Sequence, residues 1–291
     1  MYSSKIKKNS NMHKFQCGKY ILDLSRRTYI MGVLNVTPDS FSDGGDYLDQ
    51  NKAIEHALKM EKQGADIIDI GAESTRPGAK QVSADDQLLR IEYAVKILAK
   101  KLKVPISIDT SSSIVAQHCL ELGASIINDV FALRKDAKLA KVIAEYKAGV
   151  ILMHMDKTPW DMQKNPQYKN IAVEIKAFLN QAKQRAIKSG IKQQRIMLDP
   201  GIGFGKTTEH NLEIINNLAC FKSLGCGILI GTSRKSFIGK VLNLPIKERE
   251  FGTAASIALS IANGANVVRV HNVQQMRQVS GLSDAIIRQG F

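Results

Sequence analysis

The chain has 291 residues, a length that fits one large α/β barrel or two ordinary domains. Its 41 Lys and Arg against 27 Asp and Glu give a net charge of +14, but the basic residues are spread along the chain without interleaved aromatic residues, so we expect no nucleic acid partner. No run approaches the roughly 18 apolar residues of a membrane span, and the four cysteines lack CxxC or secreted spacing, which indicates a soluble cytoplasmic protein with no membrane partner.

Residues 1–14 are basic and polar, and we expect them to form a disordered tail. Residues 15–28 are expected to form a short hairpin that plugs the bottom of a barrel. From residue 29 onward, apolar strand-like runs alternate with amphipathic segments of helical period. The predicted strands cover 29–36, 66–70, 106–109, 125–130, 150–153, 195–198, 227–230 and 266–270. The predicted helices cover 52–63, 85–102, 114–122, 137–146, 171–189, 210–218, 253–262 and 273–287.

Three helix-to-strand junctions share one pattern, in QGADIIDI, LGASIIND and NGANVVRV. Each has a Gly at a predicted left-handed helix C-cap, followed by a small residue and then a strand. Together with the short connections, this repetition predicts a single (β/α)8 TIM barrel over residues 15–291, with a short N-terminal hairpin. A doubly wound open sheet is the alternative that the pattern leaves open.

Residues 31–45, MGVLNVTPDSFSDGG, change abruptly from an apolar run to polar residues, Gly and Pro. An apolar run without polar alternation is typical of a strand that is covered on both faces. Pro38 excludes a helix directly after this strand. Asn35 lies near the carboxyl end of the strand, where α/β folds bind ligands. We interpret residues 36–45 as a loop that closes over a polar ligand.

A polar residue closes each of the predicted strands. These residues are Asn35, Asp69, Asp109, Asn128 with Asp129, His154, Asp199, Ser233 to Lys235, and Arg269 with His271. Asp109, Asn128 and Asp199 would together suit a flat heterocycle with amine and amide donors, because a carboxylate accepts two parallel hydrogen bonds. A metal site on the same carboxylates is the alternative, and Asp109 could instead cap the following helix.

The cationic residues of the strand ends and glycine-rich loops predict a receptor for phosphate or pyrophosphate. They are Arg76, Arg234, Lys235 and Arg269. We interpret His271, beside Arg269, as an anion ligand rather than a general base, and His154 as part of the pocket wall. The GIGFG string lacks the spacing of a dinucleotide fingerprint.

Eight segments in chain order carry a likeness to one enzyme family. They are MGVLNVTPDSFSDGG, DIGAESTRPGA, SIDT, IIND, LMHM, LDPGIGFGK, GTSRKSFIG and RVHNV. This set closely resembles the dihydropteroate synthase family, apart from the tail and the helix surfaces. The resemblance implies an alkyl-transferring enzyme of folate biosynthesis that condenses 6-hydroxymethyl-7,8-dihydropterin pyrophosphate with 4-aminobenzoate. It also implies Mg²⁺ as cofactor, a homodimer, and competition by sulfonamides for the aminobenzoate site.

The resemblance also implies a role for individual residues. The pterin would be held by Asp109, Asn128, Met153, Asp199 and Lys235. The pyrophosphate would be held by Asn35, Arg76, Arg269 and His271, with Asn35 also binding Mg²⁺. The aminobenzoate pocket and its loops would be formed by Thr75, Pro77, Phe41, Asp43, Phe204 and Ser236. The expected catalytic residues are Lys235, Asp109, Asp199 and Arg269.

Two other functions are compatible with such a barrel. One is a pterin-binding methyltransferase domain that passes a methyl group from a reduced folate to a corrinoid protein. The other is a non-enzyme, either a basic binding module or a paralogue without turnover. The SRK string and Arg269 favour the synthase over the methyltransferase, which has no use for a receptor for pyrophosphate, and the intact loop residues argue against a loss of turnover.

Overall fold

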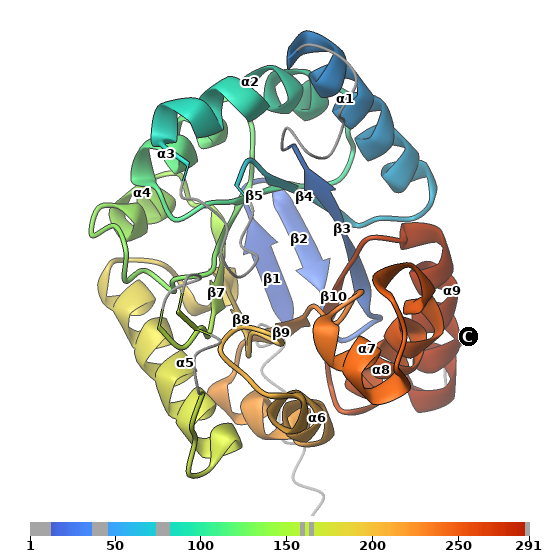
Figure 1. Ribbon diagram of the computed structural model, residues 1–291. Helices are drawn as coiled ribbons and strands as arrows, with labels where there is room; N and C mark the ends of the chain where they lie inside the picture. The colour runs from blue at the N-terminus through green and yellow to red at the C-terminus, as the bar shows by residue number, and fades with distance from the viewer. Residues whose placement is uncertain (1–12, 37–45, 74–81, 158–160, 163–165, 289–291) are drawn as a thin grey trace, which may run out of the picture.

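Parallel strands close into a barrel that is surrounded by helices (Figure 1). The computed structural model describes residues 13–36, 46–73, 82–157, 161–162 and 166–288. The barrel order is β10-β3-β4-β5-β6-β7-β8-β9, with β10 pairing in parallel with β3. This closure confirms the predicted (β/α)8 barrel and excludes the open doubly wound sheet.

Each barrel strand lies within one residue of its predicted bounds. The strands are β3 (Tyr29–Asn35), β4 (Ile67–Gly71), β5 (Ile106–Asp109), β6 (Ile126–Asp129), β7 (Gly149–Met153), β8 (Ile196–Asp199), β9 (Gly227–Ile230) and β10 (Val267–Val270). Most of their side chains are buried, because one face of the sheet packs on the helices and the other fills the barrel. This burial on both faces explains why the strands are apolar without alternation.

The predicted helices are also present. They are α1 (Asp46–Lys62), α2 (Ala84–Lys101), α3 (Ser113–Glu121), α4 (Leu139–Glu145), α5 (Ile171–Lys188), α6 (Thr208–Asn216), α8 (Glu250–Ala262) and α9 (Val273–Arg288). Helix α1 begins at Asp46 rather than at the expected position 52. Helix α7 (Ser236–Leu242) was not predicted, because its seven residues are too few to show a helical period. Short 3-10 helices η2 (Gln193–Arg195), η3 (Leu218–Leu224) and η4 (Ile246–Glu248) complete the connections.

The three predicted glycine C-caps adopt the left-handed conformation. The φ angles are 98° at Gly64, 114° at Gly123 and 105° at Gly264. A side chain on any of them would be strained, so this conformation favours glycine. The sharp reversal lets each helix return directly to the next strand of the barrel.

The N-terminal hairpin closes the amino-terminal end of the barrel. It consists of β1 (Lys14–Cys17) and β2 (Tyr20–Asp23), which pair antiparallel. Phe15 and Cys17 are buried among inward-facing residues of the strands, such as Ile151. A Cβ on Gly149 would lie only 2.6 Å from the Phe15 ring, so the hairpin is pressed directly against β7. The predicted plug is confirmed, while the predicted tail up to residue 12 lies outside the described residues.

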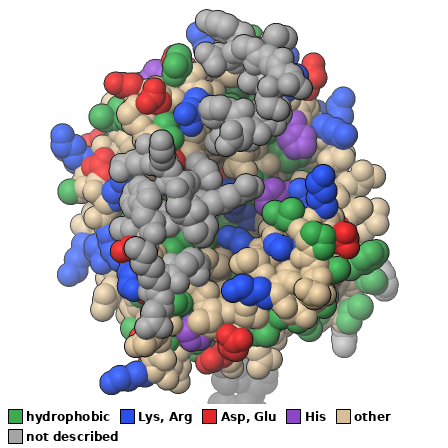
Figure 2. Space-filling model, in the orientation of Figure 1, with side chains coloured by type: hydrophobic (Ala, Val, Ile, Leu, Met, Phe, Trp, Pro, Cys, Tyr) green, Lys and Arg blue, Asp and Glu red, His purple; other side chains and the backbone are tan. Residues whose placement is uncertain are grey.

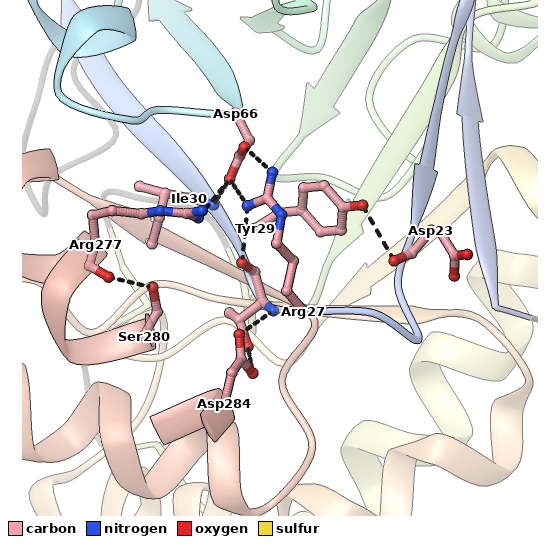
Figure 3. A network of polar contacts seen from close by, with 9 residues as sticks. Asp23, Arg27, Tyr29, Ile30, Asp66, Arg277, Ser280 and Asp284 are labelled. Carbon is pink, nitrogen blue, oxygen red and sulfur yellow. Dashed lines mark hydrogen bonds and ion pairs between the residues drawn. The ribbon is translucent and has the colours of Figure 1, made fainter. Parts of the chain in front are cut away.

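Charged side chains attach the last helix to the first strand of the barrel (Figure 3). Asp66 accepts two hydrogen bonds from Arg27, at 2.6 and 2.8 Å, and one from the backbone N–H of Ile30 at 2.9 Å. Asp284 of α9 accepts from the backbone N–H and the hydroxyl of Thr28, at 2.6 and 2.9 Å. These contacts hold the start of β3 in place opposite the end that carries the site.

Candidate active site

The upper layer of the barrel interior is mainly polar, whereas the layer beneath it is mainly apolar. Side chains alternate along a strand, so the interior residue nearest each carboxyl end lies two positions after a residue of the apolar layer, except on β5, where Asp109 follows the buried Ser107. These upper residues are Val33, Asp69, Asp109, Asn128, Met153, Asp199, Gly231 and Arg269. The barrel interior therefore changes within one layer from apolar residues to polar and charged ones. We call this upper layer the floor of the site.

One pocket opens above this floor. Its lining includes nine of the residues that the sequence singled out, namely Asp109, Asn128, Met153, Asp199, Phe204, Ser233, Lys235, Arg269 and His271. They come from the strands β5, β6, β7, β8 and β10 and from the loops that follow β8, β9 and β10. Figure 2 shows Lys, Arg and His side chains near the centre of the same face, beside the grey atoms. Carboxylates, an amide and cations thus share one cavity.

Arg269 is held by two carboxylates at the floor of the pocket. Its Nε donates to Oδ2 of Asp69 at 2.7 Å, and its Nη2 donates to Oδ2 of Asp109 at 3.2 Å. Burial would lower the pKa of Arg269, but the charges of Asp69 and Asp109 outweigh burial and raise it. The cation is therefore permanently charged and already oriented within the pocket.

Asp69 is a site residue to which sequence analysis assigned no role. Its side chain is fully buried, and Oδ2 also accepts a hydrogen bond from Nδ2 of Asn128 at 3.2 Å. A single carboxylate in the otherwise apolar strand IIDIG is the sequence signal that could have revealed it. Asp69 joins the amide and the guanidinium of the site from below.

The pocket carboxylates have perturbed pKa values. Burial is the main cause that raises the pKa of Asp109; the charge of Asp69 adds to it and that of Arg269 opposes it. Burial likewise raises the pKa of Asp199 to about 6, although the N–H of Gly201 and the charge of Lys235 act in the opposite direction. Asp109 accepts a hydrogen bond from Arg269 and Asp199 accepts one from Gly201, and since a carboxylate can accept several, both have capacity for N–H groups of a ligand.

The loop after β8 brings Phe204 to the pocket. Gly201 begins the turn with a φ of 71° and donates its N–H to Oδ1 of Asp199 at 2.7 Å. A Cβ on Gly201 would lie 1.9 Å from the carbonyl oxygen of His154, so only glycine fits this close approach. The turn places the Phe204 ring 4.2 Å from Nζ of Lys235. This is a cation–π distance, and it joins the loops after β8 and β9.

Ser233 and His271 contact each other at the cationic side of the pocket. Oγ of Ser233 lies 3.0 Å from Nδ1 of His271 and accepts the backbone N–H of His271 at 3.3 Å. Both residues line the pocket beside Arg269. Hydroxyl, imidazole and guanidinium groups so arranged can donate to the oxygens of an anion.

Asn35 lies at the carboxyl end of β3, outside the pocket lining but close to it. Its Oδ1 lies 3.5 Å from the point that a Cβ on Gly71 would occupy, and Oδ2 of Asp109 lies 3.9 Å from the same point. Within the ranges that the structure describes, no three His, Cys, Asp or Glu side chains are grouped to hold a metal ion. The Asn35 amide and the Asp109 carboxylate are oxygen groups that a metal ion at this strand end could take as ligands.

The structure excludes one alternative and corrects two expectations for individual residues. Asp109 does not cap helix α3, because Ser112 is the N-cap and accepts the N–H of Val115. His154 does not line the pocket but is buried behind the loop that follows β8. Arg234 lies outside the pocket, where its Nε is 3.7 Å from Glu250.

Two other predicted residues do not line the pocket. Asp129 uses its carboxylate to accept the N–H groups of Phe131 and Leu133, at 2.9 and 2.6 Å, so its role is in the loop after β6. Ser236 is exposed at the first position of α7 and does not line the pocket. The predictions for Phe41, Asp43, Thr75, Arg76 and Pro77 fall outside the described residues.

The barrel and its polar pocket define a class of enzyme. Residues 31–271 match a family model described as pterin binding enzyme, so the fold and site are those of a pterin-binding barrel. The dihydropteroate synthase of Clostridium beijerinckii is 44% identical over 93% of this chain and 98% of its own length. With these matches over nearly the full length of both proteins, the chain belongs to the dihydropteroate synthase family.

Solved structures agree with this assignment. A dihydropteroate synthase from Clostridium difficile, crystallised in the presence of pteroic acid, has a TM-score of 0.86 and 47% identity, covering 94% of this chain and 99% of that one. The Xanthomonas albilineans dihydropteroate synthase with 4-aminobenzoic acid has a TM-score of 0.88 and 36% identity, covering 94% and 98%. Both are similar to this chain over the entire barrel.

Proposed function

We propose that the pocket carries out the dihydropteroate synthase reaction, with the pterin on the polar floor and the leaving pyrophosphate on the cationic side. The reaction condenses 6-hydroxymethyl-7,8-dihydropterin pyrophosphate with 4-aminobenzoate to give 7,8-dihydropteroate and pyrophosphate. The observation that carries this division is the shared cavity of Asp109, Asn128 and Asp199 with Lys235, Arg269 and His271. Relatives crystallised with pteroic acid and with 4-aminobenzoic acid support the two halves of the substrate.

The pterin ring is held by the floor residues. Asp109 and Asp199 accept hydrogen bonds from its amine and ring N–H groups, and Met153 packs against it from β7. Because Nδ2 of Asn128 donates to Asp69, the amide keeps its Oδ1 and a second N–H for the ring. Lys235 supplies an ammonium donor from the start of α7.

Arg269 changes partners as the substrate enters. Its Nη2 donates to Asp109, so pterin N–H groups that reach Asp109 displace this bond. The bond from Nε to Asp69 keeps the guanidinium in place, and the freed Nη2 turns to the pyrophosphate beside His271. Binding of the heterocycle is thereby coupled to preparation of the anion site.

The leaving charge is neutralised by groups at the cationic side of the pocket. The bond between the pterin methylene carbon and the pyrophosphate oxygen breaks, and the nitrogen-rich ring shares the positive charge that develops on carbon. Mg²⁺ fits the single amide oxygen of Asn35, since this ion commonly takes few protein ligands and completes its shell with water and phosphate oxygens. When bound, it supplies further positive charge at the departing oxygen.

The aniline nitrogen of aminobenzoate then forms the new bond to the methylene carbon and releases its proton to solvent. The ring of 4-aminobenzoate packs against Phe204, next to Lys235, with Ser236 at the rim of the pocket. The family resemblance implies that Phe41, Asp43, Thr75 and Pro77 would complete this side, and that Arg76 would help to hold the pyrophosphate. Holding the neutral nucleophile in line with the breaking bond lowers the activation free energy by roughly several kcal/mol, so no strong base is required.

Turnover of the two substrates with and without Mg²⁺ tests this function. Lys235→Ala and Arg269→Ala should lose most activity while remaining folded, because each removes a cation that touches substrate. Lys240→Ala, on the exposed side of α7, is the matched control and should retain activity. Full activity of either pocket variant would remove that residue from the scheme. Pyrophosphate release also separates the synthase from a methyltransferase and from a paralogue without turnover.

The late helices support a homodimer. Large apolar side chains are exposed on α7, η4, α8 and α9, namely Val241, Leu242, Ile246, Phe251, Leu259, Leu282, Ile286 and Ile287. Phe251 is 89% exposed, and Figure 2 shows apolar side chains at the lower right, where Figure 1 draws α7 and α8. Such a patch favours a second copy of the chain. Phe251→Glu should reduce the mass measured by light scattering to that of one chain; an unchanged mass would contradict this interface.

A reducing, cytoplasmic location is supported by the cysteines. Cys17, Cys119, Cys220 and Cys226 all carry free thiols, and burial raises the pKa of Cys17 and Cys119 to about 12. Thiols held protonated in this way react slowly with oxidants. Within the described parts of the chain, none of the helices has the length and apolar character to cross a membrane. Fractionation of the producing cells tests the compartment.

A further inference from the structure

A buried lysine lies directly behind the pocket and has no part in the reaction described above. Lys206 follows the glycine-rich loop after β8, and only 3% of its surface is exposed. Its Nζ lies 2.9 Å from Nδ1 of His154 and donates to the carbonyl oxygens of Phe204 and His154, at 2.8 and 3.5 Å. The ammonium thus has an acceptor for each of its three hydrogens.

The two residues form a matched pair. Burial, with the charges of Lys206 and Arg134, lowers the pKa of His154 to about 2, so its ring is neutral and Nδ1 can accept a hydrogen bond. Burial is also the main cause that lowers the pKa of Lys206 to about 7. The His154 ring meets the Phe178 ring edge-on at 4.7 Å, which holds the imidazole in place.

This pair joins the segment after β7 to the loop that carries Phe204. The two backbones already touch, because a Cβ on Gly201 would meet His154 and a Cβ on Gly205 would lie 2.8 Å from Asp156. The other polar groups of the loop bond elsewhere: Gly203 donates to Asn211 at 2.7 Å, and Gly205 accepts from Tyr168 at 2.9 Å. Lys206 is the side chain that holds the carbonyl of Phe204, whose ring lies against Lys235.

We propose that Lys206 and His154 form a buried positioning pair that fixes the loop 200–206 and thereby the place of the Phe204 ring beside Lys235. The inference rests on the proposed position of aminobenzoate against Phe204. Loss of the pair lets the loop shift, which misplaces the nucleophile more than the pterin. The carboxylates that bind the pterin, Asp109 and Asp199, lie on the strands β5 and β8. The barrel holds the backbones of these strands independently of the Lys206–His154 pair.

Kinetics of Lys206→Met and His154→Phe test the proposal. Each variant keeps the packing volume but removes the hydrogen bonds between the two side chains, and His154→Phe preserves the edge contact with Phe178. We expect kcat/KM for 4-aminobenzoate to fall about tenfold or more, since displacement of a reactant by about 1 Å is that costly. Binding of 6-hydroxymethyl-7,8-dihydropterin, measured by calorimetry, should change by less than about threefold.

Lys183→Met is the matched control. Lys183 also donates from Nζ to a backbone carbonyl, that of Leu224 at 2.9 Å, but Leu224 ends η3, before β9 at the other end of the barrel. Lys183→Met should keep the wild-type kcat/KM for 4-aminobenzoate and the wild-type affinity for the pterin. An active wild type with Lys206→Met kinetics equal to those of Lys183→Met would overturn the inference alone, whereas an inactive wild type would overturn the proposed function with it. If Lys206→Met does not fold, His154→Phe decides, and loss of fold in both would show a purely structural pair.

Discussion

Nε of Arg269 donates to Oδ2 of Asp69 at 2.7 Å, and the same oxygen accepts the amide of Asn128 at 3.2 Å. One buried carboxylate therefore orients both a cation and an amide of the pocket. Its other oxygen, Oδ1, has no hydrogen-bond partner among the described residues. A buried carboxylate with an unsatisfied oxygen lowers the free energy of unfolding. We infer that Asp69 is retained for the geometry of the site rather than for stability.

Asp69→Asn should separate charge from shape. The amide can still accept from Arg269, but the second negative charge is lost, and that charge helps to raise the pKa of Asp109. We therefore expect the pKa of Asp109 to fall, so that pterin binding persists to lower pH, while kcat falls about tenfold to a hundredfold because Arg269 is held less firmly. Calorimetric titration with the pterin at several pH values between about 5 and 8, the range in which Asp109 titrates, measures the pH dependence of pterin binding.

Asp284→Asn is the control for this change. Asp284 also accepts hydrogen bonds, two from Thr28 and one from Arg288, but at the opposite end of the barrel. Asp284→Asn should lower the free energy of unfolding but leave the kinetic constants and their pH dependence unchanged. Equal kinetics of Asp69→Asn and the wild type would remove Asp69 from the site.

Asp199→Asn should stabilise the protein while abolishing its activity. The pKa of Asp199 is about 6 in the folded protein, above its ordinary value of 3.8, because of burial. The folded state then holds its proton more tightly than the unfolded state, so this group makes stability fall as pH rises from about 4 to 6 and keeps it low above. Asn cannot ionise and escapes this loss, which amounts to about 3 kcal/mol at most.

Urea denaturation of both proteins at several pH values measures the difference. The free energy of unfolding of Asp199→Asn, relative to wild type, should grow between pH 4 and 6, roughly where Asp199 titrates, and stay constant above. A difference that does not vary with pH would mean that Asp199 has an ordinary pKa.

Phe15→Ala should weaken the fold without changing the chemistry. The Phe15 ring is 1% exposed and fills the amino-terminal end of the barrel, so its removal leaves a cavity that costs about 3–5 kcal/mol. Gly149→Ala alone should also destabilise, since the added methyl would lie 2.6 Å from that ring. In the double variant the methyl occupies part of the cavity, and the two losses should not add.

Thermal unfolding and steady-state kinetics of the three variants decide this point. Turnover per folded molecule should equal that of the wild type, because the plug lies below the apolar layer and the pocket above it. Additive losses of stability would show that Phe15 and Gly149 do not share one space.

The sequence predicted the strands, their polar ends and the pocket, because local periodicity and the direction of parallel strands determine all three. It did not predict which polar ends bond to each other. Arg269 and Asp69 lie 200 positions apart, and no local pattern reports their contact. His154 was expected in the pocket wall, yet its ring turns to Lys206 because both side chains fit one buried space behind the loop. Side-chain direction at a strand end is set by packing.

Arg249→Lys should reduce catalysis by displacing Lys235. Nη1 of Arg249 donates to the carbonyl oxygens of Arg234 and Lys235, at 3.2 and 3.4 Å, and Nε donates to that of Leu244 at 3.1 Å. A single ammonium cannot replace this fork, so kcat should fall about tenfold with the fold retained.

Gly239→Ala tests the same contacts of Arg249, which we call the Arg249 clamp, by a change in the helix that Arg249 packs against. An added Cβ would collide with the Arg249 guanidinium, so kcat should fall as it does in Arg249→Lys. In the double variant the thinner Lys side chain relieves the collision, and the combined loss in kcat should be smaller than the product of the two. Arg288→Lys is the control, since Arg288 donates to the Ser25 carbonyl and to Asp284 at the opposite end of the barrel. Normal kcat in both Arg249→Lys and Gly239→Ala, measured with saturating substrates, would show that α7 and Lys235 hold their position without this clamp.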